Sequence, residues 1–195
     1  MSLRTSTVSI PRLIHGASLV DPSLHSPDLL HFLEAELSDW MIDHIADCVQ
    51  ATVEGAFDEP TSSRQQQIDF VTFTTNVLKR ANVTTSVLLV ALVYIDRAKP
   101  HLAISTREWA FHRVLLGALI LASKYSNDSS LKNRHWAICT GVFGMRDVGR
   151  IEREFLDVLD WELHITEDNL IGQLHRIPFI SSSDACSRLH SDTSA

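Results

Sequence analysis

The 195-residue sequence predicts an all-α fold, mainly because of two apolar segments of the same kind. Residues 87–95 and residues 114–122 are almost entirely apolar, and each is followed by polar or charged residues. A helix that is apolar on nearly every face is buried on nearly every face, so both segments are expected at the centre of a helical domain. No segment alternates apolar and polar residues as a strand with one buried face does. Hydrophobic residues make up 45% of the chain, which is ample for one core.

A helical segment is expected before the first of these apolar helices. Apolar residues recur at helical spacing from residue 26 to about residue 54. Ser26 followed by Pro27 is typical of a helix start, with the serine as N-cap and the proline at the first helical position. Ser38 is a candidate for a second start within the segment. The stretch 55–63 contains glycine, proline and serine, and it is expected to be a loop.

Residues 66–81 carry the next apolar face at helical spacing and predict another helix. The first apolar helix follows it. Thr84 or Thr85 is expected to cap its N-terminus, because a threonine side chain can accept a hydrogen bond from a free N–H of the first turn. We expect this helix to end near Pro100, since proline cannot continue a helix.

The second apolar helix is expected to begin at a cap formed by Ser105 or Thr106 and to end near Tyr125. A cluster of serine, asparagine and aspartate residues follows and predicts a turn. Residues 131–140 then predict a short helix that ends at Gly141.

Two further helices are predicted toward the C-terminus. Residues 146–163 have a clear amphipathic pattern, with Val148, Ile151 and Phe155 on the inward face. Thr166 is expected to cap a last helix that extends to about His175, with acidic residues in its first turn.

Composition restricts the classes of function. The net charge is −7 and no Lys/Arg cluster is visible in the sequence, so a nucleic-acid-binding role is disfavoured. Cys48, Cys139 and Cys186 have no paired spacing, which favours reduced thiols in an intracellular protein. The N-terminus lacks the apolar core of a signal peptide, and neither apolar segment is long enough to cross a membrane. An intracellular location, in the nucleus, the cytoplasm or both, is expected.

Motifs that would indicate an enzyme are absent from the sequence. It contains no glycine-rich phosphate loop, no nucleophile elbow and no His-Glu-x-x-His zinc motif. Its ten histidines are scattered, and none is paired with cysteine at metal-ligand spacing. We therefore expect no catalytic residue, no metal site and no cofactor.

Three short motifs lie at the ends of predicted helices. They are Tyr-Ile-Asp-Arg at 94–97, Ala-Ser-Lys-Tyr at 122–125, and Ile-Glu at 151–152 followed by Leu-Asp-Trp-Glu-Leu at 159–163. Together they resemble the cyclin box, and in particular the Pcl-type cyclins of fungi, which activate a cyclin-dependent kinase. The resemblance extends from about Phe70 to Leu163. Each motif alone is weak evidence, but three in the right order form a fairly specific signal.

The resemblance implies a single five-helix cyclin box with an extra N-terminal helix and a short C-terminal helix. Many cyclins carry a second five-helix repeat, and too little of this chain remains for one. The expected parts are a flexible arm (1–25), an N-terminal helical segment and loop (26–63), the cyclin box (64–165), a C-terminal helix (166–180) and a polar tail (181–195).

The resemblance also implies two polar contacts to a kinase. Lys124 matches a cyclin lysine that hydrogen-bonds main-chain carbonyls next to the kinase's regulatory helix, and an ammonium group offers three donors for this purpose. Glu152 matches the cyclin glutamate that accepts main-chain N–H groups. From the residues alone, Lys124 is also explained as a cation at a helix C-terminus or as a snorkelling side chain, and Glu152 as part of a solvated charged run. Glu154 is the rival candidate for the Glu152 role.

Trp161 and Leu163 match the aromatic residue and the leucine that line the cyclin surface receiving the kinase helix. A tryptophan that seals the edge of the core explains the pattern equally well.

Asp96 and Arg97 are expected to be mainly structural. The arginine-containing motif with which this aspartate pairs in two-box cyclins is absent, because residues 70–74 contain no arginine. Asp96 is therefore expected to pair with a helix N-terminus or with Arg97, and the substrate-docking patch that some cyclins build from that motif is not transferred.

These observations lead to a functional hypothesis. The chain is expected to be a noncatalytic regulatory subunit that binds and activates a cyclin-dependent protein kinase, a Pcl-type partner kinase, without contacting nucleic acid or a membrane. The alternative is a cyclin-fold adaptor that binds a peptide or a transcription factor without activating a kinase, because fold alone does not fix function. Loss of Lys124 and Glu152 would abolish kinase activation but leave an adaptor functional.

Overall fold

The computed structural model describes residues 24–57 and 63–177 of the chain. Within these two ranges it contains α-helices and short 3-10 turns but no β-strand, so the predicted all-α fold is confirmed. The elements are α1 (Pro27–Glu34), α2 (Asp39–Glu54), α3 (Arg64–Arg80), α4 (Thr85–Ala98), the 3-10 turn η2 (Lys99–His101), α5 (Ala110–Ser126), α6 (Asn133–Thr140), α7 (Met145–Val158) and α8 (Glu167–Leu174).

Helices α4 and α5 form the centre of the molecule, as their apolar sequences predict. Every residue of α4 from Val87 to Ile95 is buried, and so is every residue of α5 from Val114 to Ser123. The two helices pack extensively against each other; α4 also contacts α1, α2 and α8, and α5 also contacts α2, α3 and α7. Burial on all sides removes their apolar side chains from water, which is the main driving force for this arrangement.

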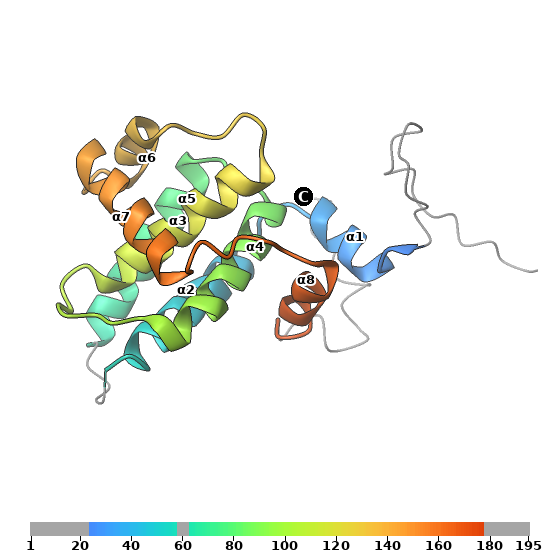
Figure 1. Ribbon diagram of the computed structural model, residues 1–195, viewed down its shortest axis with the longest axis horizontal. Helices are drawn as coiled ribbons and strands as arrows, with labels where there is room; N and C mark the ends of the chain where they lie inside the picture. Colours follow the sequence, from blue (N-terminus) through green and yellow to red (C-terminus); the bar gives the residue numbers. More distant parts are fainter. Residues whose placement is uncertain (1–23, 58–62, 178–195) are drawn as a thin grey trace, which may run out of the picture.

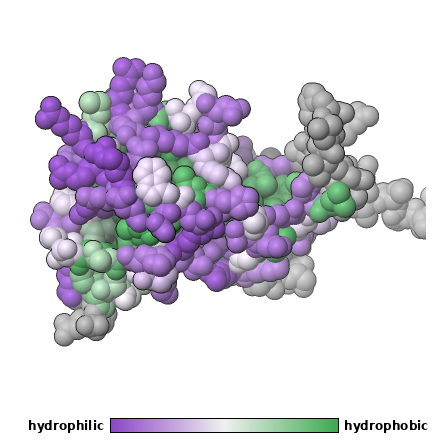
Figure 2. Space-filling model, viewed as in Figure 1, coloured by the Kyte–Doolittle hydropathy of each residue, from purple (hydrophilic) through white to green (hydrophobic). Residues whose placement is uncertain are grey.

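Figure 1 shows how the remaining helices surround this pair. Helices α6 and α7 lie together at one end of the molecule, and α1 and α8 lie together at the other. On the face drawn in Figure 2, the surface is mostly hydrophilic, and hydrophobic residues show only in small areas between polar ones. The surface is polar because many of the apolar side chains are buried in α4 and α5.

Side-chain caps begin several helices where the sequence predicts them. Ser26 accepts a hydrogen bond from the Leu29 N–H at the start of α1, Thr84 caps α4, and Thr166 caps α8. Helix α3 begins two residues earlier than predicted, because Ser63 and Gln66 form a reciprocal capping box. The expected second start at Ser38 is also present, and it divides the N-terminal segment into α1 and α2.

Two predicted helix boundaries are wrong. Neither Ser105 nor Thr106 caps the second apolar helix, because α5 begins at Ala110. The preceding residue, Trp109, has a left-handed φ of 63°, so the right-handed helix cannot extend further toward the N-terminus. Helix α7 ends at Val158 rather than at residue 163. There the backbone turns at Asp160 and Trp161, with left-handed φ values of 48° and 60°.

Helices α3 to α7 supply the five helices of the expected box, preceded by α1 and α2 and followed by α8. The exact division of the chain into parts stays a prediction. Most of the expected arm and all of the expected polar tail, including Cys186, lie outside the described residues.

Candidate functional site

Lys124 and Glu152 form an ion pair, although 28 residues separate them in the sequence. Lys124 lies in the last turn of α5, where the buried helix reaches the surface, and Glu152 lies on α7. The Lys124 Nζ donates a hydrogen bond to the Glu152 Oε1. The Lys124 side chain is 37% exposed and the Glu152 side chain only 15%. The two residues expected to make polar contacts with a partner therefore lie side by side.

This ion pair keeps unused hydrogen-bonding capacity. An ammonium group has three N–H donors, and a carboxylate has about four acceptor positions. Among the contacts of the described residues, Lys124 uses one donor and Glu152 accepts two hydrogen bonds. The pair can thus meet further carbonyl and N–H groups without first breaking.

Asn133, a residue that the sequence did not predict to belong to the site, makes the second hydrogen bond to Glu152. It is the first residue of α6, and its Nδ2 donates to the Glu152 Oε2 over 2.7 Å. No motif marks an asparagine at this position, because the contact depends on how α6 packs against α7.

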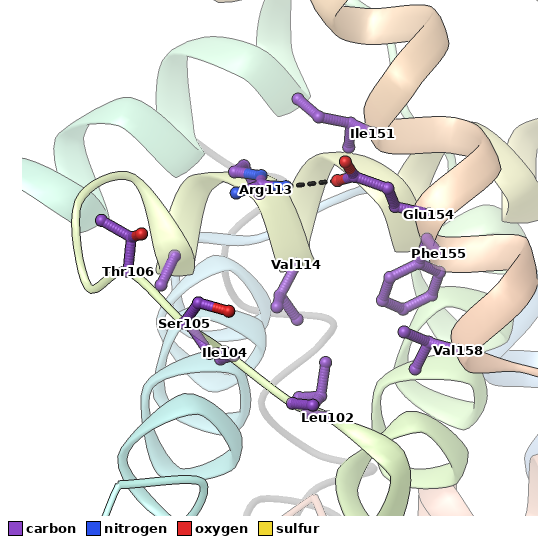
Figure 3. A pocket seen from close by; sticks show the side chains of 12 residues that line it. Leu102, Ile104, Ser105, Thr106, Arg113, Val114, Ile151, Glu154, Phe155 and Val158 are labelled. Carbon is purple, nitrogen blue, oxygen red and sulfur yellow. Dashed lines mark hydrogen bonds and ion pairs between the residues drawn. The ribbon is translucent and has the colours of Figure 1, made fainter.

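Glu154, the rival candidate, lies on a different face of α7 from Glu152. In an α-helix, residues two positions apart in the sequence, such as Glu152 and Glu154, point about 200° apart around the helix axis. Glu154 forms an ion pair with Arg113 of α5 beside a pocket of about 320 Å³. Figure 3 shows this pocket, which is lined by apolar side chains such as Leu102, Val114 and Phe155. Of the two glutamates, the structure brings only Glu152 to Lys124.

Trp161 projects from the turn that follows α7. The residue is exposed, with 64% of its surface accessible to solvent. It is therefore not sealed into the core, in contrast to Trp136, which is 1% exposed. A left-handed backbone is uncommon for a bulky residue, and such strain is concentrated at functional positions. The geometry presents a large aromatic surface to solvent.

Leu163 lies in the irregular stretch between α7 and α8, of which residues 162–165 are called the closing segment. The Tyr94 hydroxyl donates to the Leu163 carbonyl oxygen over 3.0 Å, and the Ile165 N–H donates to the Tyr125 hydroxyl over 3.2 Å. Leu163 itself is half-buried against the core. Both tyrosines belong to the sequence motifs that mark the helix ends, but their role in holding this segment could not be inferred from those motifs.

Arg97 also holds the closing segment. Its guanidinium donates to the carbonyl oxygens of Glu162 over 2.7 Å and His164 over 3.1 Å, and it reaches Asn169 of α8 at 3.4 Å. Asp96 pairs with Arg176 over 2.7 Å, so the expectation that it would pair with Arg97 or a helix N-terminus is wrong. The partner follows α8 in the sequence, and its position depends on the docking of α8 onto α4.

Within residues 24–57 and 63–177, no group of three or more His, Cys, Asp or Glu side chains could hold a metal ion. Cys48 and Cys139 are free thiols in this part of the chain. Burial raises the pKa of the Cys48 thiol to about 11, and it also raises the pKa of Cys139. Both thiols are therefore protonated near neutral pH, unlike a nucleophilic cysteine. No helix of the described residues is long and apolar enough to span a membrane.

Comparison with known families identifies the type of domain that carries these features. The model of the cyclin N-terminal domain matches residues 43–164, which include both α5 and α7 and end within the closing segment. The expected resemblance to a cyclin box is confirmed.

Curated relatives show the same similarity. The chain is 34% identical to PHO85 cyclin-9 of Saccharomyces cerevisiae over 152 residues, which cover 75% of this chain and 49% of that protein. It is 40% identical to PHO85 cyclin-2 of the same yeast over 111 residues, or 55% of this chain and 35% of the relative. It is also 28% identical to Cyclin-U4-1 of Arabidopsis thaliana over 159 residues, which cover 77% and 74% of the two chains. The matched regions thus span half or less of the yeast relatives.

Proposed function

The chain belongs to the cyclin family, and we propose that it is a noncatalytic regulatory subunit that binds and activates a cyclin-dependent protein kinase. The relatives from yeast are named as cyclins of PHO85, which supports a Pcl-type partner kinase. The proposal assigns no catalytic residue and no cofactor to this chain. It places the protein inside the cell, where the kinase is, in the nucleus, the cytoplasm or both.

The observation that carries the proposal is the Lys124–Glu152 pair at the junction of α5 and α7. Its free donors and acceptors suit the two kinds of main-chain group, carbonyl oxygens and N–H groups. Lys124 would donate to carbonyl oxygens of the kinase, and Glu152 would accept from N–H groups. Charge-assisted hydrogen bonds of this kind fix orientation as well as contributing affinity.

Trp161 and Leu163 supply the apolar part of the proposed contact surface. An aromatic side chain that becomes buried on binding is a common energetic anchor of a protein interface. Trp161 is 64% exposed in the free chain, so it has a large area left to bury. The hydrogen bonds from Tyr94 and Arg97 to the closing segment support the backbone on which Leu163 lies.

Activation follows from where this surface would bind. Contacts with the regulatory helix in the small lobe of the kinase would hold that helix inward. The kinase's own Lys–Glu ion pair would then be in place for phosphoryl transfer. The kinase would bind ATP and Mg²⁺, and this chain would act only by stabilising the active arrangement.

The test is co-purification with a PHO85-type cyclin-dependent kinase, together with an assay of the kinase activity. The Lys124→Ala/Glu152→Ala variant is compared with Arg113→Ala/Glu154→Ala, which removes the other ion pair between α5 and α7. We expect the first variant to lose binding and activation and the second to retain both, with circular dichroism showing that each is folded. Equal binding by the two variants would contradict the assigned contacts. Wild-type chain that binds no kinase would favour the adaptor.

A further inference from the structure

The Glu152 carboxylate is held from two sides before any partner binds. Lys124 of α5 donates to its Oε1, and Asn133 of α6 donates to its Oε2. We infer that Asn133 is a positioning residue that fixes the Glu152 carboxylate in the orientation in which it meets a partner's main chain. The inference rests on the proposed function and adds a third helix, α6, to the contact site.

The orientation of the Asn133 amide follows from its surroundings. Its Nδ2 lies 2.7 Å from a carboxylate oxygen, which can only accept hydrogen bonds when ionised. Rotating the amide by 180° would place two acceptors against each other. The Asn133 Oδ1 is buried and has no hydrogen-bond partner among the described residues, so no second interaction determines the side chain's position. The contact with Glu152 is therefore the one polar contact of this amide within the described part of the chain.

Fixing both oxygens of Glu152 has a consequence for binding. A glutamate side chain has several rotatable bonds, and ordering it during association opposes binding. Lys124 alone would hold one oxygen, and the carboxylate could still rotate about that contact. The second donor comes from a different helix, so the plane of the carboxylate is set in the free protein. Its remaining acceptor positions are then presented without further ordering.

A link between α6 and α7 that serves only stability is the ordinary explanation for such a contact. The two explanations differ in what they predict for Asn133→Asp. Aspartate keeps the size of asparagine and is favourable in the first turn of a helix, but it removes the donor and adds a charge beside Glu152. A purely structural role predicts loss of stability with unchanged affinity, whereas a positioning role predicts loss of affinity in a protein that stays folded.

The experiment measures the Kd of the full chain for a purified PHO85-type cyclin-dependent kinase by titration calorimetry. The variants are Asn133→Ala, Asn133→Asp, Glu152→Ala and Asn133→Ala/Glu152→Ala, with Asn76→Ala on the exposed face of α3 as the matched control. Losing the ordering of one side chain corresponds to about a fivefold weaker Kd for Asn133→Ala. We expect Asn133→Asp to weaken binding more than this in a protein that circular dichroism shows to be folded. Asn133→Ala should add nothing once Glu152 is alanine.

The outcomes distinguish failure of the inference alone from failure of the assigned Glu152 contact. If Glu152→Ala weakens binding but both Asn133 variants bind like the wild type, the inference is wrong and the proposed function stands. An equal effect of Asn133→Ala with and without Glu152 would show that Asn133 does not act through the carboxylate, which also overturns the inference. If Glu152→Ala leaves the Kd unchanged, the assigned contact and the inference fail together.

Discussion

Gly117 of α5 lies directly against the Phe155 side chain of α7. A Cβ atom placed on Gly117 would be 2.7 Å from both the Cβ and the Cγ of Phe155. Non-bonded carbon atoms in folded proteins essentially never come this close. The absence of a side chain at 117 therefore lets the two helices approach closely. These are the helices that carry Lys124 and Glu152, so their separation sets the geometry of the proposed contact site.

Gly117→Ala should destabilise the protein. Alanine is favoured over glycine inside a helix by up to about 1 kcal/mol, but overpacking a core typically costs about 1–3 kcal/mol. The Cβ of Phe155 is anchored to the α7 backbone and cannot move aside alone, so the clash should outweigh the gain in helix propensity. We expect the free energy of unfolding to fall by about 1–2 kcal/mol in a urea titration.

Gly172 provides the matched control for this prediction. It is also helical, in α8, but nothing lies within 4 Å of a Cβ placed there. Gly172→Ala should raise the free energy of unfolding by about 0.5–1 kcal/mol, because only the propensity term remains. If both substitutions shifted stability in the same direction, contact with Phe155 would not be what requires glycine at 117.

Trp161→Ala should separate binding from stability. The residue is 64% exposed, and truncating an exposed side chain usually changes the free energy of unfolding by no more than about 0.5 kcal/mol. Removing an aromatic anchor from an interface typically costs at least about 2 kcal/mol, or roughly thirtyfold in Kd. The checks are a thermal melt and a kinase-binding titration of the same preparation.

Trp136→Ala is the contrasting variant, because Trp136 is 1% exposed and lies in the core. It should lower the free energy of unfolding by about 3–5 kcal/mol. A Trp161→Ala protein that lost stability on that scale would show that Trp161 packs against the core, which is the alternative left open by its sequence.

The sequence was sufficient for the central helices because their burial depends on composition alone. Residues 87–95 and 114–122 have no polar face, and no partner needs to be known to infer that they are buried. The caps at Ser26, Thr84 and Thr166 were equally predictable, because each acts on an N–H group three residues away.

The closing segment could not be predicted in the same way. The amphipathic pattern of α7 continues past Val158, and nothing local marks the left-handed turn at Asp160 and Trp161. The closing segment after this turn is held by hydrogen bonds from residues about 70 positions away, such as that from Tyr94 to Leu163. The contact of Asn133 with Glu152 and that of Asp96 with Arg176 also depend on tertiary packing. Resemblance to a family identified the contact candidates, but their neighbours came from the structure.

His112 should make stability depend on pH. Its ring is packed between Phe70, Phe73 and Trp109, with ring centroids 5.3, 4.4 and 4.9 Å away. Its Nδ1 is buried and has no hydrogen-bond partner among the described residues. Burial lowers the pKa of His112 from 6.5 to about 4, because the charged form is poorly solvated there. Between these two values the unfolded chain binds the proton and the folded protein does not.

The free energy of unfolding should therefore have its full value above pH 6.5 and should fall as the pH decreases from 6.5 toward 4, by on the order of 3 kcal/mol from this residue. His112→Phe, which keeps an aromatic ring in the cluster, should reduce the slope of unfolding free energy against pH in that range. Burial also lowers the pKa of His44, so part of the slope will persist. His101→Gln, a change at an exposed histidine, is the control; an unchanged slope in His112→Phe would contradict the prediction.

Arg97→Lys should loosen the closing segment and weaken kinase binding without altering a proposed kinase contact. The Arg97 guanidinium donates to the carbonyl oxygens of Glu162 and His164, and its planar group can serve two acceptors at once. A lysine is a single point donor on a flexible stem, so it cannot hold both carbonyls in the same way. The expected losses are about 1 kcal/mol of unfolding free energy and severalfold in kinase affinity, with faster hydrogen exchange in residues 161–166.

Arg150→Lys, at an exposed arginine 3.9 Å from Asp147, should change none of these. If Arg97→Lys accelerated exchange in the segment but left the affinity unchanged, the orientation of Leu163 would not matter for binding, and the apolar contact would rest on Trp161 alone.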